Sequence, residues 1–194
     1  MKKILILFAH PVYERSRAQK VLATAAQQVQ GVTFRDLYER YPDFDVDVQK
    51  EQQLLQVHDI IILQHPLYWY SMPALLKQWI DLVLVHGWAY GHEGHALDGK
   101  LFLQALSAGT QQQSYAVGEA HNHPLREFLY PIEQTAKICR MQYLPPFVVH
   151  GVHHIAEPEL LAWGEKFKRA LLLLQQSKFT PAVWQQAQYL NDLL

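Results

Sequence analysis

The chain has a single cysteine, Cys139, among its 194 residues, so it cannot form an internal disulfide and fits a reducing compartment. Its 17 basic and 18 acidic residues give a formal net charge of −1, without the basic excess typical of nucleic-acid-binding proteins. No apolar run approaches the ~20 residues of a membrane-spanning helix, and residues 4–9 are too few for a signal-peptide core. We therefore expect a soluble, cytoplasmic protein without a nucleic-acid partner.

Two kinds of ligand motif are also missing. No G-x-G-x-x-G follows the first apolar segment, which weighs against a dinucleotide-binding Rossmann domain, and no aspartates cluster at strand ends as in a phosphorylated receiver domain. The 11 histidines include His92 and His95 at i, i+3 spacing and the adjacent His153 and His154, but none comes with the other ligands of a recognised zinc motif. We therefore predict no metal site.

Short apolar segments alternate with helical patterns along the chain. Buried strands are predicted at residues 4–9, 32–37, 59–64, 101–106 and 147–152, and helices at 16–29, 49–58, 74–85, 124–140 and 158–174. This alternation predicts an α/β fold: a five-stranded parallel sheet in the flavodoxin-like order 2-1-3-4-5, with helices on both faces. Since no repeat or linker divides residues 1–194, we expect one domain, with a core at about 3–176 and a partly helical C-terminal extension at about 177–194.

Ligands of such sheets bind outside the carboxyl ends of the strands, so the loops after strands 1, 3 and 4 are the candidate site. The first loop leaves a strand and enters a helix, which brings free N–H groups and the positive helix end to one place. There Ser16 can donate to a phosphate, His10 can donate as well, and Arg15 or Arg17 can supply charge. Ordinary helix capping by Ser16 is the alternative.

The second loop, QHPLYWYSMP at residues 64–73, is the most informative segment. Its three consecutive aromatic residues, Tyr68, Trp69 and Tyr70, cannot all face the core from one regular element. Exposed rings are costly unless they stack on a flat ligand or pack on a partner, and local packing on the next helix is the alternative. In the third loop, Gly109 would let the backbone approach the pyrimidine end of a flavin closely.

Several of these segments resemble one family. The chain resembles the flavodoxin-like NAD(P)H:quinone oxidoreductases in four segments: the AHP motif with its following serine, QHPLYWYSMPALLKQWID, HGWAYG and LPPF. Within that family the resemblance is strongest to the ancillary subunits of glutathione-regulated potassium-efflux systems, and DLYERYPDFDVDVQKEQ supports it. The similarity extends from residue 4 to about residue 174.

The resemblance implies an FMN site whose phosphate is held by His10, Ser16, Arg17, Ala18 and Gln19. It implies that the isoalloxazine ring is flanked by Pro66, Leu67, Tyr68, Trp69 and Tyr70, and on the other side by Ser107, Ala108, Gly109, Thr110 and Tyr115. Tyr90 and His121 would meet the substrate. The chain departs from the family pattern at Gln19, where an asparagine is usual, and at Thr110, where glycine is usual. A Cβ at Thr110 is expected to oppose a positive φ and to weaken flavin binding.

The activity implied by the resemblance is a two-electron hydride transfer from NAD(P)H, by way of FMN rather than FAD, to a quinone or related electrophile. A homodimer is implied, with the active site completed near the subunit boundary. The alternative is a regulatory ancillary subunit, with weak or no catalytic role, that docks on a potassium-efflux antiporter at the inner face of the cell membrane.

Overall fold

The computed structural model describes residues 1–178 and 181–194. Its strands are β1 (Ile4–Phe8), β2 (Val32–Asp36), β3 (Ile60–Pro66), β4 (Leu101–Ser107), β5 (Gln142–Tyr143) and β6 (Phe147–Val149). The α-helices are α1 (Ala18–Gln27), α2 (Leu37–Arg40), α3 (Val48–Val57), α4 (Ala74–Val83), α5 (Tyr130–Ile138), α6 (Glu157–Gln175) and α7 (Pro181–Trp184). Short 3₁₀ helices are η1 (Tyr13–Arg15), η2 (Gln112–Ser114), η3 (Leu125–Leu129) and η4 (Leu190–Leu193).

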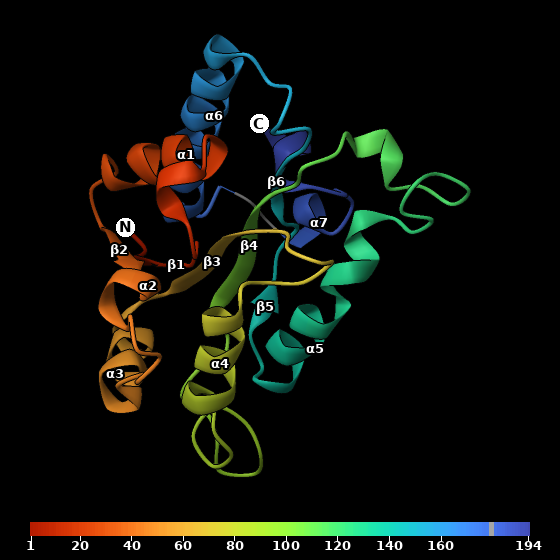
Figure 1. The fold of residues 1–194 in the computed structure, drawn as a ribbon. Helices are drawn as coiled ribbons and strands as arrows, with labels where there is room; N and C mark the ends of the chain where they lie inside the picture. The colour runs from red at the N-terminus through yellow and green to blue at the C-terminus, as the bar shows by residue number, and fades with distance from the viewer. Residues whose placement is uncertain (179–180) are drawn as a thin grey trace.

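The strands form one parallel sheet in the order β2-β1-β3-β4-β5, with β6 also paired to β4 (Figure 1). The predicted flavodoxin-like order is confirmed. Because every strand runs the same way, the carboxyl ends of β1, β3 and β4 lie at one edge of the sheet, and the loops that follow them meet there.

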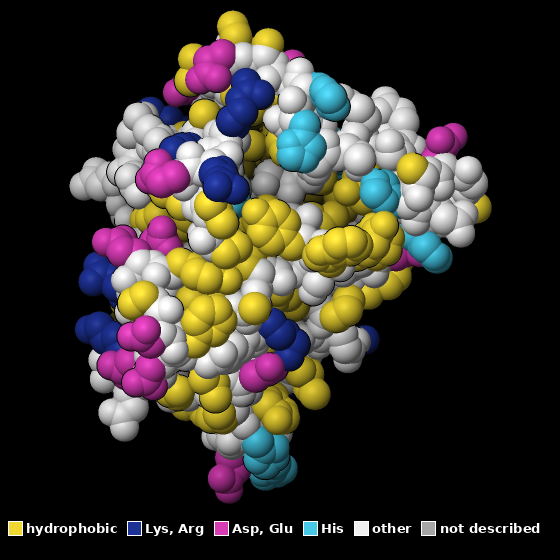
Figure 2. Space-filling model, in the orientation of Figure 1, with side chains coloured by type: hydrophobic (Ala, Val, Ile, Leu, Met, Phe, Trp, Pro, Cys, Tyr) yellow, Lys and Arg dark blue, Asp and Glu magenta, His cyan; other side chains and the backbone are white. Residues whose placement is uncertain are grey.

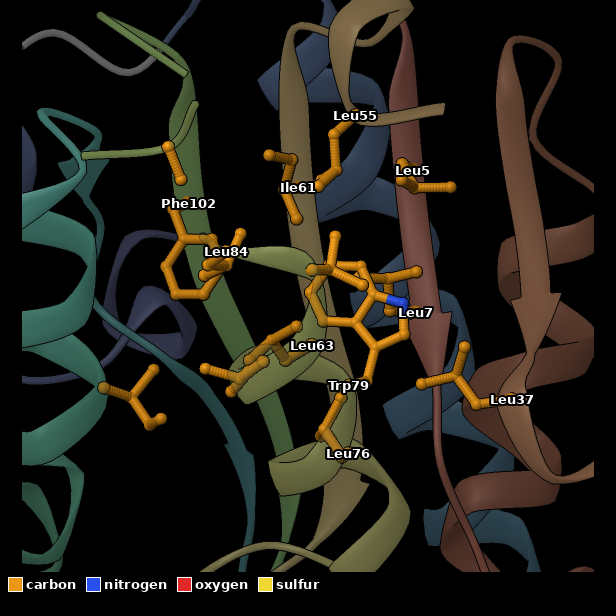
Figure 3. Close-up of a cluster of buried hydrophobic side chains, with 14 of the residues drawn as sticks. Leu5, Leu7, Leu37, Leu55, Ile61, Leu63, Leu76, Trp79, Leu84 and Phe102 are labelled. Atoms are coloured by element: carbon orange, nitrogen blue, oxygen red, sulfur yellow. The ribbon is translucent and has the colours of Figure 1, made fainter. Parts of the chain in front are cut away.

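Alternating residues of the central strands face two separate cores, as the period of a strand requires. On one side, Leu5, Leu7, Ile61 and Leu63 pack against α3, α4 and α5 (Figure 3). On the other side, Ile4, Ile6, Ile60 and Ile62 pack against α1 and α6. Full burial of one such side chain stabilises the fold by roughly 1.5–3 kcal/mol. Helices therefore cover both faces, as predicted (Figure 1).

Trp79 of α4 joins the first of these cores to a buried polar group. Its ring is 1% exposed and lies among the leucines of β1 and β3 (Figure 3). Its indole Nε1 donates to Glu51 Oε2 at 3.0 Å. The other carboxylate oxygen of Glu51 accepts from Arg35 Nε at 2.5 Å and from the Tyr41 hydroxyl at 2.6 Å. This network ties α3 and α4 to β2.

Prolines explain two differences from the sequence-based expectations. The helix expected at 124–140 is a 3₁₀ turn followed by α5, because Pro131 lacks the N–H that a continuous α-helix would need and is tolerated only in its first turn. The predicted fifth strand corresponds to β6, and β5 precedes it as a separate short strand that was not predicted, because Pro145 and Pro146 between them cannot donate to β4. The strand β6 ends at Val149 instead of residue 152, since Gly151 turns the chain with φ +68°.

The C-terminal segment packs on the outer side of β6. The side chain of Asn191 accepts from Val148 N at 2.9 Å and donates to Val148 O at 2.8 Å, in place of a neighbouring strand. The predicted short helix of the extension corresponds to α7, and part of that extension, residues 179–180, lies outside the described residues. No helix in the described part of the chain has the length and hydrophobicity needed to cross a membrane.

Candidate functional site

A cleft of about 480 Å³ opens at the carboxyl edge of the sheet, between the loops after β1, β3, β4 and β6. Its volume is in the range of small-molecule sites, roughly 300–1,000 Å³. Its lining residues are His10, Val12, Arg15, Ser16, Arg17, Ala18, Pro66, Leu67, Tyr68, Ser107, Gly109, Val152 and His153. Figure 2 shows basic and histidine side chains gathered on this side of the molecule, above a band of apolar side chains.

One end of the cleft is built by the loop that leads into α1. Ser16 Oγ accepts a hydrogen bond from Gln19 N at 3.2 Å, so it caps the first turn of the helix. Other N–H groups of that turn have no helical partner, which makes the end of α1 a suitable anion site beside Arg15 and Arg17. Arg17 also lies 3.6 Å from Glu157, and both side chains are largely exposed, so this contact leaves the guanidinium available. Helix capping and anion binding are compatible here.

His10 is buried between this end of the cleft and the aromatic loop. Burial lowers its pKa below the usual value for histidine, which favours the neutral ring at pH 7. Its Nδ1 accepts from Val12 N at 3.1 Å, so the neutral ring carries its proton on Nε2. That nitrogen faces the hydroxyl of Tyr68 at 3.5 Å. His10 therefore presents its N–H donor toward the Tyr68 hydroxyl.

A tight turn presents the aromatic residues after β3. Tyr68 and Ser71 exchange backbone hydrogen bonds of 3.1 and 2.9 Å, and the residues between them, Trp69 and Tyr70, have φ of +47° and +62°. A residue other than glycine held in this left-handed region costs roughly 1–2 kcal/mol. Tyr68 is 40% exposed and lines the cleft, whereas Trp69 is 93% exposed and points away from the core. Tyr68 thus forms a wall of the cleft and Trp69 an outer surface, while the ring of Tyr70 packs on Phe128 with centroids 4.7 Å apart.

A layer of buried amides lies beneath the cleft. Gln19 is fully buried, and its Nε2 donates to His65 O at 2.9 Å and to Ser107 Oγ at 3.0 Å. Its Oε1 accepts from Gln64 Nε2 at 3.0 Å. This side chain joins α1 to the ends of β3 and β4 and does not line the cleft, so only the backbone of Gln19 lies where a phosphate at the start of α1 would bind. Ala108 is fully buried as well and does not line the cleft.

The buried amides continue along β3 and β4 to the edge of the sheet. Gln104 Nε2 lies 3.2 Å from His65 Nε2, and Tyr143 donates to Gln104 Oε1 at 2.8 Å. His65 Nδ1 lies 2.9 Å from the carbonyl oxygen of Pro66, which lines the cleft. Burial lowers the pKa of His65 to about 4 despite that hydrogen bond, so its ring is neutral. The floor of the cleft is thereby held by side chains from several strands.

His121 lies beside the cleft in an aromatic group. Its Nε2 is 2.8 Å from Thr110 Oγ1, and its Nδ1 is 3.4 Å from the Tyr70 hydroxyl. The Tyr115 ring stacks on the imidazole, with centroids 4.2 Å apart and planes 17° apart. Thr110 does not have a positive φ, so the expectation that its Cβ opposes such a backbone conformation is wrong. None of these four residues lines the cleft itself.

Tyr90 is far from this group in the chain's own fold. It belongs to the loop between α4 and β4, at the amino ends of the strands, where its ring packs on His86 with centroids 5.4 Å apart. Figure 1 shows this loop below α4, at the opposite end of the molecule from the segment that follows β4. One copy of the chain does not bring Tyr90 and His121 together.

The expectations from sequence also missed part of the cleft. His153 lines it from the loop after β6, and its Nε2 would lie 2.8 Å from a Cβ added to Gly109. Gly109 thus leaves room for the imidazole, and its φ is not positive. The position of His153 just after the last strand was a usable signal, because that loop ends at the same sheet edge. Within residues 1–178 and 181–194, no three His, Cys, Asp or Glu side chains are arranged to hold a metal ion.

Comparison with known proteins agrees with this arrangement. A family model described as the flavodoxin-like fold matches residues 2–170. The glutathione-regulated potassium-efflux system ancillary protein KefG of Yersinia pseudotuberculosis is 44% identical over 160 residues, which are 82% of this chain and 87% of that protein.

Two solved structures are also similar. General stress protein 14 of Treponema denticola, in complex with FMN, has a TM-score of 0.85 and 38% identity over 89% of this chain and 99% of that one. A protein described as an NADPH-quinone reductase, from P. pentosaceus, has a TM-score of 0.78 and 35% identity over 86% of this chain and 96% of that one. The chain belongs to the flavodoxin-like NAD(P)H:quinone oxidoreductase family.

Proposed function

We propose that the protein is an FMN-dependent NAD(P)H:quinone oxidoreductase that transfers two electrons to a quinone or related electrophile. The observation that carries the proposal is the cleft at the carboxyl edge of the sheet, which joins an anion-binding end at α1 to an aromatic wall at Tyr68. The FMN bound by general stress protein 14 and the activity in the name of the P. pentosaceus relative support it.

The residues of the cleft suit FMN. The N–H groups at the start of α1, with Ser16, Arg15 and Arg17, are donors and charges of the kind that hold a phosphate monoester. Tyr68 offers a ring for stacking, and Gly109 lines the cleft beside the imidazole of His153. FMN, when bound, supplies the hydride-transfer chemistry, while the chain supplies binding, orientation and electrostatics.

His121 is the residue that we propose handles the proton. An imidazole beside the cleft can donate a hydrogen bond to an oxygen of the acceptor and deliver the proton that a hydroquinone product needs. General acid assistance of this kind contributes typically 10²–10⁴-fold to a rate. Tyr90 would contribute to the same site from a second copy of the chain, because it lies at the opposite end of its own subunit. We therefore propose a homodimer.

The proposal is tested by the absorption spectrum of the purified protein before and after addition of FMN. We expect two flavin bands that bleach under NAD(P)H without oxygen and return when a quinone is added. His121→Gln should lower the rate of quinone reduction while FMN content stays unchanged. A protein that binds no FMN at micromolar concentrations would contradict the proposal. A 22.5 kDa monomer in light scattering would contradict the dimer.

A second function is favoured by the KefG relative. Its name suggests that this chain also serves as a regulatory ancillary subunit of a potassium-efflux antiporter, in the cytoplasm at the inner face of the membrane. Both functions can reside in one protein, because an active reductase can also dock on a transporter. Copurification with the antiporter in detergent is the expected result. Unchanged potassium efflux in cells that lack this chain would contradict the regulatory function.

A further inference from the structure

The carbonyl oxygen of Pro66 lies where the hydrogen-bonding ladder between β1 and β3 ends. Ala9 N donates to Gln64 O at 3.0 Å, and because alternate residues of a strand face the same neighbour, the next donor would come from residue 11. That residue is proline, which has no N–H. β1 therefore cannot supply a donor to Pro66 O, and a buried carbonyl without a donor lowers stability.

His65 supplies that donor with its own side chain. Its Nδ1 lies 2.9 Å from Pro66 O, and a carbonyl oxygen only accepts, so the neutral ring carries its proton on Nδ1. Nε2 must then accept, and the amide nitrogen of Gln104 faces it at 3.2 Å. Gln104 Oε1 accepts in turn from the Tyr143 hydroxyl at 2.8 Å. Each donor in this buried series meets an acceptor, and all of the contacts agree with one tautomer of His65.

The peptide group between Pro66 and Leu67 is thereby held on both sides. Leu67 N donates to Ser107 O at 2.8 Å on the side of β4, while Pro66 O accepts from His65 on the side of β1. The peptide group cannot rotate without breaking both hydrogen bonds. Since Pro66, Leu67 and Tyr68 line the cleft one after another, this peptide group determines where the aromatic wall begins.

We propose that His65 is a positioning residue for FMN, because its hydrogen bond from Nδ1 to Pro66 O fixes the backbone that places Tyr68 in the cleft. This inference rests on the proposed function, since FMN is the ligand that the wall would meet. His65 is fully buried and does not line the cleft, so it acts only through Pro66. A wall that is ordered before the ligand arrives loses less conformational entropy on binding, which favours affinity.

Two amide substitutions separate this donor from the rest of the ring. The amide nitrogen of asparagine lies two bonds beyond Cβ, as Nδ1 of histidine does, whereas that of glutamine lies three bonds beyond, as Nε2 does. His65→Asn can therefore still donate to Pro66 O, while His65→Gln places its amide toward Gln104 instead.

The Kd for FMN, measured by fluorescence titration, compares the two variants. We expect H65Q to raise it by roughly five- to tenfold, because one ordering hydrogen bond is lost, and H65N to stay within about threefold of the original chain. Asparagine leaves the larger cavity, so a purely structural role of the ring would instead make H65N the more harmful change.

Two NMR measurements on the flavin-free protein depend neither on activity nor on FMN. The nitrogen-15 shifts of the His65 ring, assigned through its backbone signals, should show the proton on Nδ1 and none on Nε2 at pH 7. Hydrogen exchange of the Leu67 amide should be roughly fivefold faster in H65Q than in the original chain, because this N–H belongs to the peptide group that loses a hydrogen bond. In H65N the exchange rate should stay close to that of the original chain.

The outcomes distinguish this inference from the proposed function. A proton on Nε2 of His65 in the original chain overturns the inference, and so does a Kd for FMN that rises at least as much in H65N as in H65Q. If the original chain binds no FMN, the proposed function fails, and the exchange of the Leu67 amide still decides about His65. Faster exchange in H65Q alone supports its hold on the peptide group, and equal rates in both variants overturn it. Should neither variant fold, the tautomer of the original chain decides alone.

Discussion

Replacing Glu51 by glutamine should destabilise the protein far more than breaking an ion pair at its surface. Glu51 is fully buried and accepts hydrogen bonds from Arg35, Tyr41 and Trp79 at 2.5, 2.6 and 3.0 Å. Glutamine keeps the shape but removes the negative charge opposite Arg35, whose side chain is only 14% exposed. It also places either an NH₂ group or a weaker acceptor in front of the donors that now share the carboxylate.

The expected loss can be estimated from general values for buried pairs. Removing one partner of a buried ion pair costs about 3–5 kcal/mol, because the other charge stays buried without compensation. The partial exposure of Arg35 points to the lower end of that range. For a chain of this size, about 3 kcal/mol corresponds to a fall in Tm of roughly 6–12 °C.

Urea unfolding followed by far-UV circular dichroism measures this loss. The matched control is Asp81→Asn, which breaks the Lys77–Asp81 pair, with distances of 2.5 and 2.7 Å but side chains 59% and 56% exposed. It should cost no more than about 0.5 kcal/mol. Adding Arg35→Met to Glu51→Gln should recover part of the stability, since no charge is then left unpaired. Equal losses for the Glu51 and Asp81 variants would refute the reasoning.

Three further expectations can be checked on the same protein. Gly164→Ala should lower the unfolding free energy by about 1–3 kcal/mol in spite of the better helix propensity of alanine, because the new Cβ would lie 2.7 Å from Val21 Cγ1. Recovery of stability on adding Val21→Ala would support this cause, and an increased Tm of Gly164→Ala would refute it. Burial lowers the pKa of His65 to about 4 in the folded chain, below its unfolded value, so the unfolding free energy should fall as the pH drops from about 6.5 to 4, by up to about 3 kcal/mol from this group. Urea unfolding of His65→Gln should show a weaker pH dependence, and an identical pH dependence would count against this role of His65. Tyr68→Ala should raise the Kd for FMN by roughly 2–13-fold, which is the equivalent of one aromatic contact. An unchanged Kd in a fluorescence titration would show that Tyr68 does not stack on the flavin.

The fold was largely accessible from the sequence, because its central strands are buried on both faces and read as continuous apolar runs. Residues 60–63, for example, are all buried in the sheet, and the alternation of strands with helices left few possible topologies. The break before α5 was missed although Pro131 is visible in the sequence. The helix α2 was missed as well, since four residues capped by Asp36 carry no periodic pattern.

The site was only partly accessible for a different reason. That the loops after strands 1, 3 and 4 meet follows from strand order, so a cleft that includes Ser16, Tyr68 and Gly109 could be expected. Whether a polar side chain points into the cleft or beneath it depends on contacts distant in sequence. Gln19 turns inward because a carbonyl and a hydroxyl from two other strands are there to bond it, and no local pattern records that.

The turn at Trp69 and Tyr70 has a consequence for how this chain responds to selection. Both residues occupy a backbone conformation that glycine adopts without strain. Trp69 is 93% exposed and has little packing to lose, so glycine there should raise stability by up to about 1 kcal/mol, whereas the Tyr70 ring packs on Phe128 with centroids 4.7 Å apart. A library sorted only for folded yield should therefore enrich glycine at position 69, and one selected for function should keep the aromatic ring. Comparing the two libraries would show directly where evolution has given up stability for what this ring does.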